Sequence, residues 1–144
     1  MTGTIESIPL ISASIMSKKI AEGTASLVLD VKVGSGAFVT DHARATELAH
    51  TMLGLGAAHG VRSVALLTGM DAPLGRAVGN ALEVAEALEV LSGGGPSDLV
   101  ELALTLAREM LGLAGIEADP ATALVDGSAL ASWRAMVAAQ GGRP

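Results

Sequence analysis

The chain has 144 residues, half of them hydrophobic, with a net charge of −6 and no cysteine. This length allows one compact domain, and the lack of cysteine excludes disulfides, thiolate metal sites and a cysteine nucleophile. There is no basic stripe for nucleic acid, and no stretch reaches the roughly 18 uncharged apolar residues of a membrane span. The start, Met1–Thr4, lacks a signal-peptide pattern. We therefore expect a soluble, cytoplasmic protein that binds neither nucleic acid nor membrane.

The first part of the chain is expected to form a helix and then a strand. A helix is predicted over residues 7–21, with Ser7 as a possible N-cap and Gly23 at its end. Its apolar side is formed by four isoleucines, Ile8, Ile11, Ile15 and Ile20. Residues 25–33 are mostly apolar and rich in β-branched side chains, which is typical of a buried strand.

The remaining elements continue this alternation. A helix from about Asp41 to Ala58 precedes a second strand at residues 61–68. Further helices are predicted at residues 74–92, 98–113 and 127–139, with a short turn led by Pro120 between the last two. Strand–helix alternation indicates an α/β fold with parallel strands. Two parallel strands alone rarely form a stable sheet. We therefore expect a partial parallel sheet with flanking helices.

Two groups of polar residues lie where a ligand could bind. Ser14 and Lys18 are four residues apart, so they share one helix face, where a hydroxyl and an ammonium could hold a carbonyl-bearing ligand. A solvated helix edge is the alternative. Lys32 and residues 34–36 (Gly-Ser-Gly) follow the first strand, where sites of α/β proteins usually lie. An ordinary tight turn is the alternative there.

Acidic side chains suggest one further site. Glu83 and Glu86 lie three apart and could bind a hard cation together with backbone carbonyls, although a solvated helix face is the alternative. Asp30 and Asp71 have no evident partner in the sequence. Spacings of eight and nine residues do not place the histidines on one helix face, so we expect all three on the surface: His42, His50 and His59.

Three stretches carry a resemblance to a known family. Residues 7–38 contain SIMSKK followed by LDVKVGSGAF, residues 66–88 read LLTGMDAPLGRAVGNALEVAEAL, and GGGPSDLVELALTLAREML follows. Together they resemble the middle section of the pyrimidine-nucleoside and thymidine phosphorylases, over essentially the whole chain. The form PLGRAVGNALEV is more similar to the pyrimidine-nucleoside branch.

The resemblance implies a pentosyltransferase that performs reversible phosphorolysis of uridine, thymidine or deoxyuridine. Phosphate, the co-substrate, attacks the anomeric carbon and the pyrimidine leaves. In this family a serine and a lysine of the first helix contact the base, which corresponds to Ser14 and Lys18 here. Ile11, Ile15 and Phe38 are then expected to form apolar walls of the same site.

The family also implies a structural cation, two domains and a homodimer. A potassium ion would be held by the backbone carbonyls of Leu74 and Ala77 and by the carboxylate of Glu86. Residues 1–23 would belong to a small all-α domain, and residues 24–144 to a large α/β domain.

Other family features have no counterpart in these residues. The phosphate-binding loop and the catalytic histidine would precede this section, as would the arginine that contacts the base, and an α+β portion would follow it. Because positioning of the nucleophile provides much of the rate enhancement, we expect no useful phosphorolysis from the chain alone. A truncated, non-catalytic interaction module and a related phosphoribosyltransferase are the alternatives.

Overall fold

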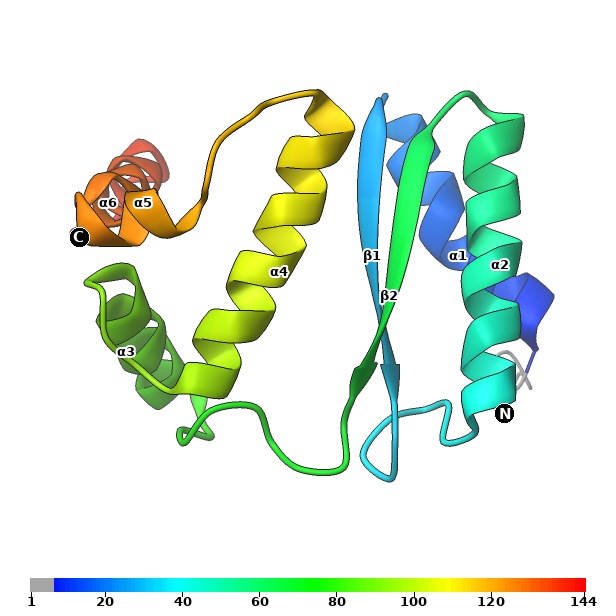
Figure 1. Cartoon of the computed structure of the whole chain (residues 1–144), viewed down its shortest axis with the longest axis horizontal. Helices are drawn as coiled ribbons and strands as arrows, with labels where there is room; N and C mark the ends of the chain where they lie inside the picture. The colour runs from blue at the N-terminus through cyan, green and yellow to red at the C-terminus, as the bar shows by residue number, and fades with distance from the viewer. Residues whose placement is uncertain (1–6) are drawn as a thin grey trace. The chain divides into compact units, whose positions relative to one another are not determined.

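The computed structural model describes residues 7–144, shown in Figure 1. The start of the chain, where we expect no signal-peptide pattern, lies outside these residues. The chain divides into two compact units. The first runs to Ala72 and includes residues 109–116, and the second comprises residues 73–108 and 117–144. None of the helices in residues 7–144 combines the length and the hydrophobicity that a membrane-spanning helix needs.

The first unit is a parallel strand pair with two helices. It contains α1 (Ile8–Ala21), β1 (Ser26–Val33), α2 (His42–Ala58) and β2 (Arg62–Gly69). The strands pair in parallel from Ser26 opposite Arg62 to Val33 opposite Gly69. The predicted α/β class and partial parallel sheet are therefore confirmed. The assignment of residues 1–23 to a separate helical domain stays a prediction, and its first six residues lie outside the described part of the chain.

Helix α1 ends where the sequence predicts. Gly23 has φ +74°, and its N–H donates to the Ile20 carbonyl at 3.0 Å while the Thr24 N–H donates to the Lys19 carbonyl at 3.3 Å. These two bonds form a Schellman motif, which requires a left-handed residue at this position. At the other end Ser7 is the N-cap residue, but its side chain makes no capping hydrogen bond.

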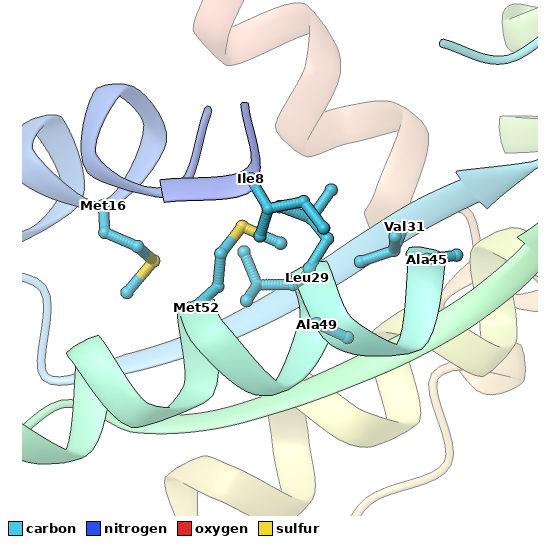
Figure 2. Close-up of a cluster of buried hydrophobic side chains, with 8 residues drawn as sticks. Ile8, Met16, Leu29, Val31, Ala45, Ala49 and Met52 are labelled. Atoms are coloured by element: carbon cyan, nitrogen blue, oxygen red, sulfur yellow. The ribbon is translucent and has the colours of Figure 1, made fainter. Parts of the chain in front are cut away.

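The core of this unit lies between the two helices and one face of the strands. Its buried members are shown in Figure 2: Ile8, Met16, Leu29, Val31, Ala45, Leu48, Ala49 and Met52. Side chains from α1, β1 and α2 point toward one another there. Leu29 and Val31 alternate with outward residues, as on any strand with one buried face. The other predicted isoleucines of α1 pack at the edge of this core and are partly buried.

The second unit is helical: α3 (Asn80–Leu91), the first part of α4 (Ser97–Ala114), α5 (Ala121–Val125) and α6 (Ser128–Ala139). The predicted start of a helix at residue 74 is wrong, since α3 begins at Asn80. Gly75 and Gly79 have φ values of +72° and +132°, which an α-helix cannot contain. The segment between them is instead held by side-chain hydrogen bonds.

Candidate functional site

An open pocket of about 600 Å³ lies in the first unit. Four of the five predicted base-site residues line it: Ile11, Ser14, Ile15 and Phe38. Leu48 and Met52 of α2 add aliphatic surface, and the exposed lining is mostly apolar. Pockets with apolar walls and a few polar groups are typical of small-molecule sites. The structure thus brings together predicted residues from α1 and from the loop after β1.

Ser14 and Lys18 form a pair on an exposed face of α1. The Lys18 Nζ donates to the Ser14 Oγ at 3.5 Å, so the predicted common face is confirmed. Ser14 lines the pocket but Lys18 does not. The serine hydroxyl remains able to donate to a ligand while it accepts from the lysine. Lys18 has further N–H groups, so both side chains can act as donors beside the pocket.

The glycine-rich loop after β1 packs tightly against the loop after β2. The Ser35 N–H donates to Asp71 Oδ1 at 2.8 Å, and the Gly36 N–H donates to the Met70 carbonyl at 2.8 Å. A Cβ on Gly36 would lie 2.6 Å from that carbonyl oxygen. Glycine, which has no Cβ, therefore allows the backbones of the two loops to approach each other closely. Asp71, which has no evident partner in the sequence, is one of the residues that hold these loops together.

Phe38 follows this loop and is 87% exposed. It lines the pocket, yet most of its ring faces solvent, so it lies at the rim. A large exposed aromatic side chain contributes little to the core and is available to a bound ligand.

An ion pair that was not predicted lies on β1. Lys32 Nζ lies 2.7 Å from Asp30 Oδ2 and donates to Thr68 Oγ1 at 3.0 Å, and Thr68 Oγ1 also donates to Asp30. Both Asp30 and Lys32 line the pocket. Asp30 and Lys32 are two residues apart on one strand, which places both side chains on the same face. This spacing is the feature of the sequence from which their ion pair could have been predicted. The interpretation of Asp30 as an acid without a partner is wrong.

In the second unit, Glu86 is a buried carboxylate, 8% exposed. It accepts hydrogen bonds from the Arg76 N–H at 3.0 Å and from the Ala77 N–H at 3.3 Å. The Arg76 guanidinium lies 3.8 Å from the same carboxylate and also pairs with Glu89. A Cβ on Gly75 would overlap the carboxylate. Because Glu86 is buried, the alternative of a solvated helix face is wrong for this residue.

The residues predicted to hold the cation lie on α3 and on the segment that precedes it. Glu86 contacts the segment that contains Ala77 and directly follows Leu74. Within the described residues, no backbone N–H donates to the carbonyls of Leu74 or Ala77. Hard cations bind to carboxylate oxygens and to backbone carbonyl oxygens that accept no other hydrogen bond. No cluster of three His, Cys, Asp or Glu side chains occurs in residues 7–144, so backbone oxygens would have to contribute.

Two more carboxylates bind the same segment. Asp98 Oδ2 accepts from the Gly75 N–H at 3.0 Å and Asp98 Oδ1 accepts from the Leu99 N–H at 2.9 Å. The Gly75 amide, followed by the Leu99 amide, holds the pKa of Asp98 below its ordinary value of 3.8. Glu83 accepts from the Gly79 N–H at 2.9 Å. The segment is thus held by carboxylates from both α3 and α4.

The three histidines are exposed, as the sequence predicts. The His59 Nδ1 lies 2.9 Å from the Leu55 carbonyl on the same helix. None of the three lines the pocket.

Comparison with known proteins identifies the family. Residues 1–134 match the model of the glycosyl transferase family, a/b domain. The chain belongs to this family. The resemblance seen in its motifs is therefore confirmed.

Its relatives include nucleoside phosphorylases. A thymidine phosphorylase of Mycobacterium tuberculosis is 68% identical over 143 residues, which are 99% of this chain and 34% of the relative. A human thymidine phosphorylase is 50% identical over 151 residues, 100% of this chain and 31% of the relative. A pyrimidine-nucleoside phosphorylase of Staphylococcus aureus is 48% identical over 149 residues, 99% of this chain and 34% of the relative. The chain thus spans about a third of the length of the curated relatives it matches.

Proposed function

We propose that this chain is a section of a pyrimidine-nucleoside or thymidine phosphorylase and contributes part of its base-binding pocket. The observation that carries the proposal is the shared pocket of Ile11, Ser14, Ile15 and Phe38. The names of the relatives support it. The reaction would be reversible phosphorolysis, with a pyrimidine nucleoside and phosphate as substrates.

The pocket chemistry suits a pyrimidine leaving group. When phosphate attacks the anomeric carbon, the bond to the base nitrogen breaks and its electron pair goes to the base. Ser14 and Lys18 are the donors available to its carbonyl groups and ring nitrogen as negative charge develops there. The aliphatic walls and Phe38 would cover the faces of the ring, which limits the water that competes for those donors.

A cation site is the second part of the proposal. The Leu74 and Ala77 carbonyls and the Glu86 carboxylate would hold a potassium ion. Such an ion would supply positive charge that the buried Glu86 can neutralise. A homodimer, as the family resemblance implies, and a cytoplasmic location, as the composition leads us to expect, belong to the same proposal.

The residues that orient phosphate would come from the rest of a longer protein. The best test therefore uses this chain as part of a full-length phosphorylase. A chimera in which it replaces the matching 143 residues of the M. tuberculosis relative would be incubated with uridine or thymidine and phosphate, and release of free base measured. We expect phosphate-dependent release from the chimera and none from the chain alone.

Two lysines provide a matched pair for this test. Lys18→Ala should abolish most release by the chimera, because it removes a donor to the leaving base. Lys19→Ala should retain it, because Lys19 pairs with Glu22 at 3.1 Å on an exposed surface, whereas Lys18 donates to Ser14 of the pocket. Equal activity of both variants would contradict the proposed base contact. Consumption of free base that requires phosphoribosyl pyrophosphate and releases pyrophosphate would favour a phosphoribosyltransferase. Self-association without turnover would favour an interaction module.

A further inference from the structure

The loop before α3 is held through its backbone amides. We refer to residues 75–79 as the amide loop. The Gly75 N–H donates to Asp98, the N–H groups of Arg76 and Ala77 donate to Glu86, and the Gly79 N–H donates to Glu83. Four of its five amides therefore point at carboxylates.

The geometry of the peptide group then determines where one carbonyl points. No cis peptide bond occurs in residues 7–144, and in a planar trans peptide the C=O of one residue is opposite the N–H of the next. The Leu74 carbonyl and the Gly75 N–H belong to the same peptide group. Because Asp98 accepts that N–H at 3.0 Å, the Leu74 carbonyl must point away from Asp98.

Gly75 is restrained from a second side as well. Its φ of +72° is left-handed, and the Glu86 carboxylate lies so close that a Cβ would overlap it. Glu86 therefore limits movement of the Gly75 Cα, while Asp98 fixes the rotation of the preceding peptide plane. Of the two carboxylates, only Asp98 is bonded to the amide that shares a peptide group with the Leu74 carbonyl.

We propose that Asp98 is a positioning residue for the cation site, holding the Leu74 carbonyl in the orientation that binds a monovalent cation. The inference rests on the proposed potassium site, and Asp98 itself is not a ligand in it. Residues that orient metal ligands in this way commonly change metal affinity by about 10-fold or more when removed.

Potassium binding, measured without reference to turnover, tests this. The chimera would be titrated with potassium chloride against tetramethylammonium chloride at constant ionic strength, with the melting temperature and calorimetric binding as readouts. In Asp98→Ala we expect the potassium concentration for half-saturation to rise about 10-fold. Asp98→Asn should show a smaller rise, because its amide oxygen can still accept from Gly75. Glu101→Ala, which removes an exposed carboxylate further along α4, should match the unsubstituted protein.

The outcomes distinguish the positioning role of Asp98 from the existence of the cation site. Unchanged potassium affinity in Asp98→Ala would overturn the positioning role while leaving the cation site in place. A melting temperature lowered equally with and without potassium would also overturn it, since that is a purely structural effect. If the unsubstituted chimera binds no potassium, the cation site and this inference are both wrong, whereas base release tests the phosphorolysis proposal independently. If Asp98→Ala does not fold, Asp98→Asn decides by the same comparison.

Discussion

Gly34 and Asp71 lie so close that a Cβ on the glycine would be 2.8 Å from the Asp71 Oδ1. The same oxygen accepts the Ser35 N–H. Gly34 also has φ +137°, a conformation that other residues rarely adopt. This contact joins the ends of β1 and β2 and fixes the loop that leads to Phe38.

Gly34→Ala should therefore destabilise the chain. We expect a loss of about 1–3 kcal/mol in the free energy of unfolding, from backbone strain and from displacement of Asp71. Urea unfolding of the chain would measure it. Gly54→Ala is the matched control, because Gly54 lies within α2 with nothing close to its Cβ position. That substitution should stabilise by about 1 kcal/mol, so equal effects at the two glycines would contradict the argument.

The cluster of Asp30, Lys32 and Thr68 leads to a second prediction. Thr68→Val keeps the shape of the side chain but removes the hydroxyl that bonds both charged residues. Because the Lys32 and Asp30 side chains remain 34% and 23% exposed, solvent would compensate in part. We expect a loss of about 1–2 kcal/mol, measured by urea unfolding, with the exposed Thr40→Val as control.

A double-mutant cycle would show whether the three residues act as one network. Lys32→Met and Thr68→Val should have non-additive effects, with a coupling of at least about 0.5 kcal/mol. Strict additivity would mean that the hydroxyl and the ammonium contribute separately.

How far the sequence predicts the structure differs between elements. The end of α1 at Gly23 and the start of α2 at Asp41 follow from local signals, and Asp41 does accept the Arg44 N–H at 2.9 Å. The start of α3 does not follow from such signals. Residues 74–78 include good helix formers, but Gly75 is held by Asp98, 23 residues away in sequence. Contacts at that separation override local propensity.

The same distinction applies to the candidate site. The pairing of Ser14 with Lys18 needs only the helical repeat, so spacing alone was sufficient to predict it. The contact of Lys32 with Thr68 needs the register of two strands, in which these residues are directly opposite. Chain order does not specify that register, because the strands are joined through a whole helix. The hydrogen bond of Asp30 with Thr68 therefore needs the paired strands, whereas its ion pair with Lys32 needs only the two-residue repeat of one strand.

The acid stability of the second unit should depend in part on Asp126. Its Oδ1 accepts the Ser128 N–H at 2.8 Å at the start of α6. The hydroxyl and then the amide of Ser128 hold the pKa of Asp126 below its ordinary value of 3.8. A carboxyl whose pKa is lowered in the folded state stabilises the folded protein at pH values above its pKa in the unfolded state. This contribution is lost as the pH falls through its pKa in the folded state.

Asp126→Asn should therefore reduce the difference in stability between pH 5 and pH values below 3.8. Helicity followed by circular dichroism during acid titration would measure this, and the effect should be small because Asp126 is exposed. Ser128→Ala removes only the hydroxyl and should have an intermediate effect. An acid transition that is the same in all three proteins would show that this contact is absent in solution.

Phe38 and Leu48 both line the pocket, but only one of them is also part of the core. Leu48 is 6% exposed and Phe38 is 87% exposed. Leu48→Ala should lower the free energy of unfolding by about 2–5 kcal/mol, because it leaves a cavity in the core. Phe38→Ala should change stability by less than about 0.5 kcal/mol, yet raise the KM of the chimera for nucleoside through loss of ring contact.

If Phe38→Ala instead destabilises the chain as Leu48→Ala does, the ring is a packing residue and not a wall of the base site. If it changes neither stability nor KM, the base binds elsewhere in the pocket.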